Sequence, residues 1–469
     1  MKEKEFQQLL DKTTLIAKEK GIGWGLFKTK SPESALEFVY AIEKQKGLIR
    51  QNAKLRTDSV PYKIWGAQYI DEEALAQMAA SARLPVAIKG ALMPDAHSGY
   101  GLPIGGVLAT DNAVIPYAVG VDIACRMMLT IYPSSPNVLK NPKSFEYKHL
   151  YSALLDNTIF GAGPTGIHQG KIEHPILERS HWEFSELTRL LRQTAIHQIG
   201  TSGGGNHFVE WGALEITSLN NPLGLGAGHY LALLSHSGSR GVGFKIANHY
   251  TKIAMSQLET LDHSVRHLAW LSLDEDDGKQ YWEAMQLAGA FASANHHVIH
   301  ERIAKAANLA PIATVENHHN FAWKETIVVD GKEKEAIVHR KGATPAGQGV
   351  LGIIPGTMAD PGYLVMGKGN PDALNSASHG SGRQMARTKA KKTISHDAHM
   401  AYLSQHGIDL IGGGLDEAPQ AYKPIDVVMN EQKDLVEILG KFQPTIVRMA
   451  NEENFPSRSR LPKGIVEGE

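Results

Sequence analysis

The sequence predicts a protein of mixed helices and strands, of the α/β or α+β class, and three observations lead to this prediction. The chain has 469 residues, 42% of them apolar, which suffices for one large core or for two or three domains. Segments of helical periodicity alternate with short β-like apolar runs. The glycine- and proline-rich stretches between them are short, which is typical of site loops and not of linkers between domains.

Residues 1–50 are predicted to form a helical extension before a main body of residues 51–469. Apolar residues recur at helical spacing near the start of the chain. A second helix is indicated where Ser31 offers an N-cap, Pro32 a first-turn proline and Glu33 an acidic residue. This opening is charged and amphipathic, unlike a signal peptide.

The other elements are predicted from periodicity and from the residues that begin or end each segment. Asp330-Gly331 is a two-residue turn signal between apolar runs and indicates a β-hairpin. In a helix over residues 181–199, Phe184, Leu187, Leu190 and Leu191 are expected to share one face. The remaining predicted helices span residues 71–81, 244–258, 281–307 and 384–405, and the predicted strands include residues 230–234 and the hairpin 313–339.

Composition restricts the classes of function. Lys and Arg number 48 against 49 Asp and Glu, a formal net charge of −1, so a nucleic acid must be held by a local basic patch. A run of about 18 apolar residues, as a membrane-spanning helix needs, does not occur in the sequence. One cysteine and the lack of an export signal predict a cytoplasmic protein.

The single cysteine, Cys125, lies in AVGVDIACRM, three positions after Asp122. A lone cysteine forms no intramolecular disulfide, so it is either a small buried apolar group or a reactive or metal-binding thiolate. The neighbouring carboxylate and the 22 histidines of the chain favour metal binding. Aspartate, cysteine and histidine together suit a divalent transition metal.

Three histidines lie in motifs rich in Gly, Ser and Asn, where a loop can approach a ligand closely. They are His207 in SGGGNHFVE, His236 in SHSGSRG and His319 in VENHHNFAW. One such histidine is more often a hydrogen-bonded polar residue than a ligand, but several of them beside Asp-x-x-Cys favour a shared site. Alternation along a strand places His318 on the face opposite His319, so only one of this pair can contribute.

His379 precedes a Gly-Ser-Gly turn and a predicted helix in SHGSGRQMAR, a position where backbone N–H groups and the helix dipole bind anions. It is a candidate metal ligand, or a nucleophile that takes a phosphoryl group on a neutral imidazole. Arg383 and Arg387 add positive charge. The basic run from Arg387 to Lys392 is either a solvated face or a track for phosphates.

Three other patterns carry weaker signals. The glycines of GAGPTG satisfy G-x-G-x-x-G, but a proline lies inside the loop, so a dinucleotide site is not predicted. His296 and His300, one helical turn apart without a zinc-protease glutamate, are predicted to form a polar helix face. Asp95 and His97 in MPDAHSGYG fit a functional loop and a polar turn equally well.

A series of motifs resembles the RtcB family of RNA-splicing ligases, in the order MPDAHSGYGLPIGG, AVGVDIACRM, GNHFVEW, HSGSRGVG, HHNFAWKE, HRKGAT, GIIPGTM, ASHGSGRQMAR and DEAPQAYKPID. The resemblance runs from about Trp65 to about Asp426. It implies a single α+β body with a central cleft for two Mn²⁺ ions and a nucleotide. It also implies a GTP-dependent ligase that joins an RNA 3′-phosphate or 2′,3′-cyclic phosphate end to a 5′-hydroxyl end through a histidine–GMP intermediate, in RNA repair or tRNA splicing.

The resemblance also implies roles for individual residues. The matches to the family's metal ligands, with the cysteine as bridging thiolate, are Asp122, Cys125, His207, His236 and His319. The match to the histidine that carries GMP is His379. Matches to the guanylate pocket are Asn206, Glu210, Gly380, Ser381 and Tyr422, and Thr357 falls in the loop that the family writes P-G-S-M.

The chain departs from the family around the cysteine. The family usually reads D-I-G-C-G-M, and Ala124 and Arg126 replace both glycines here, which predicts a cation beside the metals. Two other functions fit the same residues: a metal-dependent phosphoesterase acting on RNA ends, in which His379 only binds an anion, and a non-catalytic RNA- or metal-binding protein. Dependence on GTP separates the ligase from both.

Overall fold

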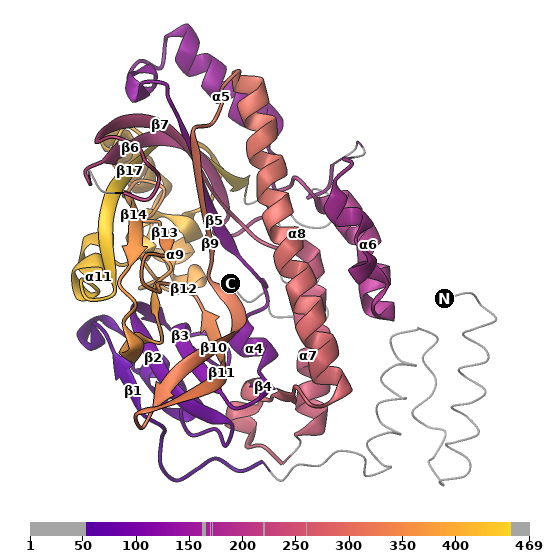
Figure 1. Ribbon diagram of the computed structural model, residues 1–469. Helices are drawn as coiled ribbons and strands as arrows, with labels where there is room; N and C mark the ends of the chain where they lie inside the picture. Colours follow the sequence, from indigo (N-terminus) through magenta and orange to yellow (C-terminus); the bar gives the residue numbers. More distant parts are fainter. Residues whose placement is uncertain are drawn as a thin grey trace, which may run out of the picture.

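The computed structural model describes residues 53–161, 166–168, 170, 172–218, 221–258 and 260–451 (Figure 1). The predicted helical extension over residues 1–50 and the middle glycine of the G-x-G-x-x-G pattern lie outside these residues. Among the described helices, none is long and apolar enough to cross a membrane. Strands form two main sheets, and helices pack around them (Figure 1).

The smaller main sheet has five strands, in the order β1-β2-β3-β11-β10. Their bounds are β1 Tyr62–Ile64, β2 Ala87–His97, β3 Ile104–Thr110, β10 Asn320–Val329 and β11 Lys332–Lys341. The predicted hairpin turn is confirmed between β10 and β11, where Asp330 (φ 50°) and Gly331 (φ 74°) both lie in the left-handed region. Two such residues match the twist of paired strands, which is why Asp-Gly is favoured there.

The larger sheet has eight strands, in the order β13-β14-β17-β6-β7-β5-β9, with β16 paired to β17. Their bounds are β5 Arg126–Tyr132, β6 Phe208–Ile216, β7 Gly228–Ser237, β9 Ala313–His318, β13 Leu351–Ile354, β14 Gly362–Gly367, β16 Asp409–Gly413 and β17 Val436–Asn451. The prediction of one hairpin over 313–339 is wrong at its first arm, because β9 belongs to this sheet and β10 to the other. The chain changes sheets at His319.

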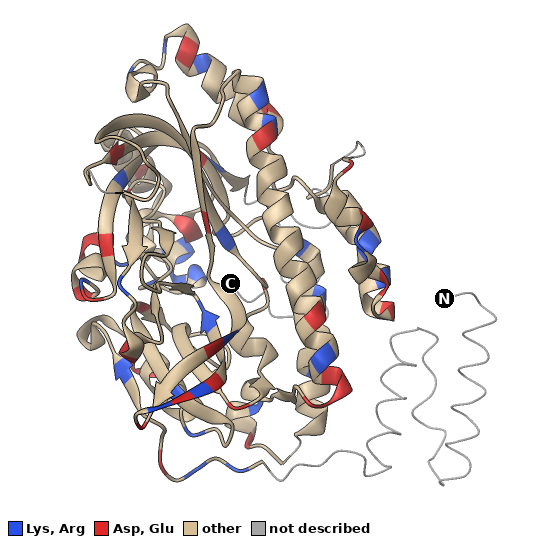
Figure 2. Cartoon of the chain, viewed as in Figure 1, with Lys and Arg blue, Asp and Glu red and all other residues tan. Residues whose placement is uncertain are grey.

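Each helix predicted among the described residues is found, whereas α4, α5 and α11 were not predicted. Their bounds are α3 Glu72–Ser81, α4 Pro116–Val119, α5 Phe145–Asn157, α6 Glu186–Gln198, α7 Arg240–Gln257, α8 Asp276–Ala307, α9 Arg387–Thr393, α10 His396–Gln405 and α11 Ile425–Glu431. Asp71 caps α3 by accepting a hydrogen bond from the backbone N–H of Ala74. Charged residues of both signs lie along α6 and α8 (Figure 2), in keeping with a net charge near zero.

Two helix predictions need correction. The predicted helix 384–405 is two helices, because Ser395 interrupts it and its side chain caps the second helix at the N–H of Ala398. On α6, Leu191 is buried but Leu190 is 62% exposed, and Phe184 precedes the helix and is also exposed. The buried face of α6 consists of Thr188, Leu191, Ala195 and Gln198.

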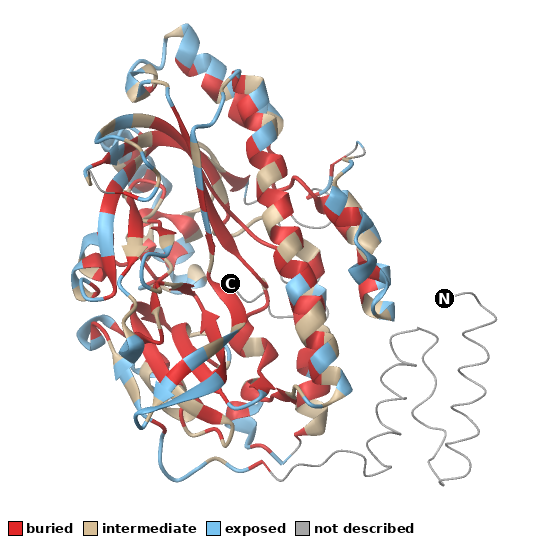
Figure 3. Ribbon diagram, in the orientation of Figure 1, coloured by how far each residue is buried: buried red, intermediate tan, exposed pale blue. Residues whose placement is uncertain are grey.

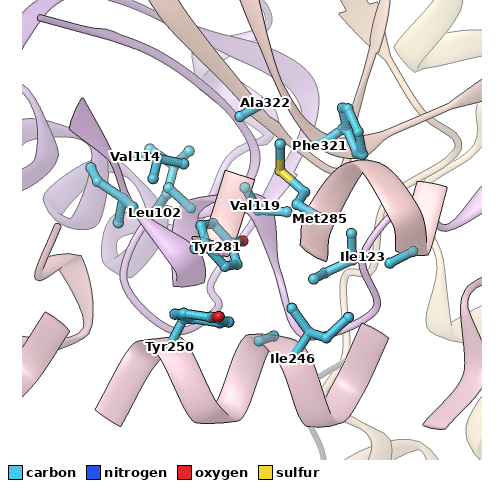
Figure 4. Packing of buried hydrophobic residues seen from close by; sticks show 14 of the residues in the cluster. Leu102, Val114, Val119, Ile123, Ile246, Tyr250, Tyr281, Met285, Phe321 and Ala322 are labelled. Atoms are coloured by element: carbon cyan, nitrogen blue, oxygen red, sulfur yellow. The ribbon is translucent and has the colours of Figure 1, made fainter. Parts of the chain in front are cut away.

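The largest core cluster lies where α7 and α8 pack against the loop that carries Asp122 and Cys125. Tyr250 from α7, Met285 from α8 and Ile123 from this loop are all buried in one cluster (Figure 4). Along α8 the face toward the sheet is buried and the opposite face is more exposed (Figure 3). Burying a side chain such as Ile123 contributes about 1.5–3 kcal/mol, so the core fixes the residues beside Ile123 in place.

Candidate active site

Four neighbouring strands of the larger sheet bring the predicted metal ligands together at one edge. The order β6-β7-β5-β9 is antiparallel throughout, so the start of β6, the end of β7, the start of β5 and the end of β9 coincide. In register, Phe208 pairs with His236, and Arg126 pairs with both Ser237 and His318. The candidate ligands stand in or directly beside these positions.

The donor atoms of these residues are close to one another. Sγ of Cys125 lies 3.1 Å from Nε2 of His236 and 3.5 Å from Nε2 of His207. Nε2 of His207 is 3.0 Å from Oδ2 of Asp122. Nε2 of His236 is 3.2 Å from Nε2 of His319. The structure thus brings together all five residues that the sequence predicts as ligands.

These donors fall into two groups that share the thiol. Cys125, His236 and His319 form one group, and Asp122, Cys125 and His207 form the other, with the ligand atoms of each group within 4.8 Å of one another. One soft sulfur, three imidazoles and one carboxylate suit a transition metal better than Ca²⁺ or Mg²⁺. The donor set therefore fits a divalent transition metal, and each group would supply three donors, of which the thiol is common to both.

Backbone contacts select the imidazole nitrogen that faces the site. Nδ1 of His207 lies 2.7 Å from the carbonyl oxygen of Ser202, and Nδ1 of His236 lies 3.1 Å from that of Asn206. A carbonyl only accepts, so each Nδ1 carries the proton and each Nε2 presents its lone pair. Such outer hydrogen bonds orient metal-binding histidines in many proteins.

Burial keeps His236, His319 and Cys125 uncharged in the absence of a metal. Desolvation and the neighbouring His207 and His379 lower the pKa of His236 to about 3. Desolvation, chiefly, also lowers the pKa of His319 well below its usual value. Desolvation and the Asp122 carboxylate raise the pKa of the Cys125 thiol well above its usual value. A bound cation reverses this last effect, because metal coordination deprotonates a thiol.

The loop around Asp122 is held by close contacts. The side-chain amide of Asn320 donates to the carbonyl oxygen of Asp122 (3.2 Å), and its oxygen accepts from the N–H of Gly342 (2.8 Å). A Cβ atom at Gly238 would lie 2.5 Å from Oδ2 of Asp122 and 2.6 Å from its Cγ. Only glycine leaves room for the carboxylate at that point.

His379 follows β15 (Ser376–Ser378) and stands beside the metal-ligand candidates. Its ring centroid is 4.9 Å from that of His319. Nδ1 of His379 donates to Oδ2 of Asp95 (2.6 Å), and the same oxygen accepts from the N–H of His379 (3.1 Å) and of Gly380 (3.3 Å). Because Nδ1 holds the proton, Nε2 carries the lone pair that a nucleophile needs.

The role of Asp95 was only half predicted from the sequence. Asp95 is fully buried and belongs to the site through His379, whereas neighbouring His97 is bonded to the Asp95 carbonyl oxygen (3.1 Å). Lys423 also lies near this carboxylate, and its ammonium donates to the carbonyl oxygens of Pro94 (3.2 Å) and Ala96 (2.7 Å). Desolvation opposes ionisation of Asp95, but His379 and Lys423 outweigh it and lower the pKa.

The prediction that His379 sits at a helix N-terminus is wrong. Helix α9 begins at Arg387, and the backbone N–H groups of His379 and Gly380 donate to Asp95. The turn is nonetheless tight, since Gly382 has φ 70° and a Cβ there would clash with the backbone of Asp95. The glycines serve the packing of the loop against β2.

The residues predicted to line the guanylate pocket form two groups around the loop that carries His379. Pro355 packs on Gly380, which brings the loop carrying Thr357 to it, and the Thr357 hydroxyl donates to Asp360 (2.6 Å). Ser381 is buried, and its hydroxyl has no hydrogen-bond partner among the described residues. The guanidinium of Arg383 donates to the Tyr422 hydroxyl (3.1 Å), so that tyrosine lies beside the same loop.

Asn206 and Glu210 flank His207 on the other side of the site. The backbone oxygen of Asn206 holds His236, and its side chain is partly exposed. Glu210 lies on β6 two residues after Phe208, so both point to one face of the sheet, and the Phe208 ring contacts that of His236 (5.6 Å). Burial raises the pKa of Glu210 well above its usual value.

Two members of the basic run, Arg387 and Lys391, are paired with acidic residues. Arg387 contacts Glu417 (2.6 Å) and Asp416 (3.1 Å), and Lys391 lies 3.6 Å from Asp416. Arg383 donates to the backbone oxygen of Asp416 (2.7 Å). The run is therefore an ion-pair network next to the His379 loop and not only a solvated face.

The prediction that Arg126 places a cation beside the metals is wrong. Arg126 does not point toward the metal-ligand candidates: its guanidinium donates to Glu316 (2.7 Å) and to the Gly289 oxygen of α8 (3.4 Å). His296 and His300 form the predicted polar face of α8, and this face is buried, because both side chains bond the Ser235 hydroxyl at 2.7 Å. Glu316 and Ser235 belong to strands that lie elsewhere in the sequence.

Comparison with known proteins gives the class of this protein. The family described as tRNA-splicing ligase RtcB matches residues 77–450, a span that contains every candidate residue described above. This match defines an RNA ligase, and the two donor groups form its candidate metal-binding cluster.

Curated relatives cover nearly the same span. The chain is 32% identical to RNA-splicing ligase RtcB of Escherichia coli K12 over 417 residues, which cover 82% of this chain and 96% of that protein. It is 30% identical to tRNA-splicing ligase RtcB of Nanoarchaeum equitans over 465 residues, covering 83% and 95%. The chain belongs to the RtcB family of RNA-splicing ligases. The predicted α+β fold and ligase class are thereby confirmed.

Proposed function

We propose that this ligase joins RNA ending in a 3′-phosphate or 2′,3′-cyclic phosphate to RNA with a 5′-hydroxyl, using GTP and two Mn²⁺ ions. His379 is the nucleophile, the residues 51–469 form the ligase domain, and residues 1–50 precede it as an extension. RNA repair or tRNA processing in the cytoplasm is the setting proposed for this activity, in line with the names of its relatives.

The donor groups support the metal part of the proposal. Asp122, Cys125 and His207 would hold one ion, and Cys125, His236 and His319 the other. Two bound cations supply charge neutralisation for a phosphoryl group in transfer. The neutral imidazoles and the fixed tautomers are the protein's own contribution, because they present lone pairs without prior loss of a proton.

The hydrogen bond between His379 and Asp95 is the observation that supports His379 as the residue that takes GMP from GTP. The 2.6 Å hydrogen bond holds the proton on Nδ1 and leaves Nε2 of His379 free to attack. In the proposed first step, Nε2 forms a bond to the α-phosphorus of GTP, and the bond to the leaving pyrophosphate breaks. In the next steps GMP passes to the RNA 3′-phosphate, and the 5′-hydroxyl oxygen then displaces GMP. A cyclic phosphate must first be opened by water.

Asn206, Glu210, Thr357, Ser381 and Tyr422 are proposed to line the guanylate pocket. Glu210 is buried, and guanine offers N–H donors that a carboxylate can accept. The buried hydroxyl of Ser381 has no partner among the described residues and is available to a phosphate or ribose oxygen. Gly380 is proposed to belong to the same pocket, since its lack of a side chain lets Pro355 of the Thr357 loop pack beside it.

The test is incubation with Mn²⁺ and α-labelled GTP, followed by assay for an acid-labile protein–GMP adduct. We expect an adduct in the wild type and none in His379→Ala, which should still bind metal because His379 is not among the proposed ligands. The His379→Ala variant should also seal RNA that already carries the 3′-phosphate–GMP anhydride. His229→Ala, an exposed histidine at the other end of β7, is the matched control.

A metal-dependent phosphoesterase is the competing function. It would act on RNA ends without GTP and would leave no adduct. RNAs with defined ends separate the two functions: sealing of a 3′-phosphate to a 5′-hydroxyl only when GTP is present supports the ligase proposed here. Sealing of a 3′-hydroxyl to a 5′-phosphate would contradict it.

A further inference from the structure

Three aromatic side chains gather next to the candidate active site without a role in it. Tyr100 lies in the loop between β2 and β3, Tyr117 on α4 and His267 in the short helix His263–Leu268. Their ring centroids are 6.4 Å apart for the two tyrosines, 5.5 Å for Tyr100 and His267, and 5.0 Å for Tyr117 and His267. We refer to these three residues as the aromatic cluster.

The cluster is open to solvent. Tyr100 is 40% exposed, and Tyr117 and His267 are partly exposed. Neither tyrosine hydroxyl has a hydrogen-bond partner among the described residues. Rings that only filled a core would be covered, so these rings have faces and hydroxyls available to another molecule.

Tyr100 lies between two glycines, Gly99 and Gly101, that pack closely against neighbouring segments. Gly101 has φ 75°, and a Cβ there would lie 3.1 Å from the backbone oxygen of His267. A Cβ at Gly99 would lie 3.5 Å from Nζ of Lys341. The same ammonium donates to the backbone oxygens of Tyr100 (2.6 Å) and Leu102 (3.0 Å). The loop is thus fastened on both sides of an exposed ring.

The cluster is close to the proposed nucleophile. Ile104 adjoins Gly99 on one side and Gly342 on the other, and a Cβ at Gly342 would meet both Ile104 and Cε1 of His379 (3.2 Å). Tyr117 precedes Asp122 by five residues, so their Cα atoms are at most about 18 Å apart. A short single strand can span that distance.

The surroundings of the cluster are cationic. Desolvation, chiefly, and the neighbouring Lys341 and Arg266 lower the pKa of His267. Lys341 is buried and bonded to backbone oxygens, whereas Arg266 is exposed and can reach a phosphate. Aromatic faces beside positive charge are the combination with which proteins bind single-stranded nucleic acid, since bases stack on rings and phosphates pair with cations. A protein partner would be expected to cover a larger apolar area than three rings.

We propose that Tyr100, Tyr117 and His267 form a stacking site for a base of the RNA strand that is to be joined, within a few nucleotides of the reactive end. This inference rests on the proposed function, because it takes the RNA ligase site at His379 as its reference point. Stacking without base-edge contacts would favour unpaired ends of any sequence.

The test uses RNA that carries the fluorescent base 2-aminopurine at successive positions from each end, because stacking on a ring quenches its emission. In the wild type we expect quenching at one or two positions. Tyr100→Ala should lose the quenching and raise KM for RNA about 10- to 100-fold, the range for loss of one stacked base. Tyr100→Trp should stay within about threefold of the wild type, since the ring remains.

The control variant is Phe145→Ala. Phe145 is 79% exposed on α5 and stacks on His149 at 6.0 Å, so it is also a surface aromatic pair but far from α4 in Figure 1. It should leave KM and quenching unchanged. RNA with an abasic residue at the quenched position should bind the wild type and Tyr100→Ala equally, because without the base neither protein can form the stacking contact.

Failure of the inference is distinguishable from failure of the proposed function. Formation of the GMP adduct needs no RNA, so Tyr100→Ala should form it at the wild-type rate. Equal KM values for Tyr100→Ala and Phe145→Ala, or an equal loss on abasic RNA, would overturn the stacking site. Absence of adduct and sealing in the wild type, with quenching retained, would instead reject the function proposed for His379.

Discussion

Replacing Gly238 by alanine should remove one metal ion and leave the other. A Cβ at this position would stand 2.5 Å from Oδ2 of Asp122, against about 3.4 Å for an ordinary contact, so the carboxylate must move by about 1 Å. Metal–ligand distances tolerate deviations of only about 0.2 Å. The group that includes Asp122 should therefore lose its ion, whereas Cys125, His236 and His319 keep theirs.

The fold should survive this substitution. The backbone at Gly238 is not in the left-handed region, so alanine fits its conformation. The clash involves the end of one side chain, and such overpacking costs roughly 1–3 kcal/mol. Gly352→Ala is the matched control, because Gly352 is also a buried glycine of the larger sheet and its Cβ would meet no atom closer than 3.7 Å.

The assay is metal content per chain together with the electron paramagnetic resonance spectrum of the Mn²⁺-loaded protein. We expect two ions and an exchange-coupled spectrum for the wild type and for Gly352→Ala. One ion, an isolated six-line spectrum and loss of RNA sealing are expected for Gly238→Ala. Two bound ions and normal sealing in Gly238→Ala would refute the assignment of Asp122 as a ligand.

Three further predictions concern single side chains. Cys125→Ala should lose both ions, because both donor groups share its sulfur, and elemental analysis that finds a full complement would contradict this. Burial lowers the pKa of His300 from 6.5 to about 3, so its neutral form stabilises the fold above pH 6.5 and that contribution declines as pH falls toward 3. Denaturation curves for His300→Gln should therefore show a shallower decline than the wild type, by up to about 1.4 kcal/mol per pH unit. Arg340→Met should lower the free energy of unfolding by about 2–4 kcal/mol, since its buried guanidinium pairs with a carboxylate at 2.5 Å. Lys334→Met removes an exposed ion pair and should lower the free energy of unfolding by under about 1 kcal/mol. Equal losses in the two variants would contradict the role of burial.

Motif residues were predictable from the sequence because their chemistry is local. Asp122 and Cys125 are three positions apart, and His207 and His236 stand among small residues that let a loop approach a ligand. The strand alternation that separates His318 from His319 is also a local property. His318 indeed packs on Phe321 (4.9 Å) and Trp323 (5.1 Å), away from His319 and the other ligand candidates.

What the sequence did not reveal depends on contacts between distant segments. Asp95 and His379 are 284 positions apart, and only the fold makes the 2.6 Å hydrogen bond between them. The direction of Arg126 is set by Glu316 on a neighbouring strand, 190 positions later. Local spacing also predicted one continuous helix over 384–405. In the structure the side chain of Ser395 caps a second helix instead, and its capping role overrides the continuous pattern.

The position of the donors at the ends of four antiparallel strands ties catalysis to correct folding. A slip of one residue in β5 or β9 would turn every side chain of that strand to the opposite face and would part Cys125 from His319. A misfolded chain would then bind no metal pair and would be inert. For an enzyme that joins RNA ends, activity would thus be limited to correctly folded chains, because only a correctly registered sheet brings the donors together.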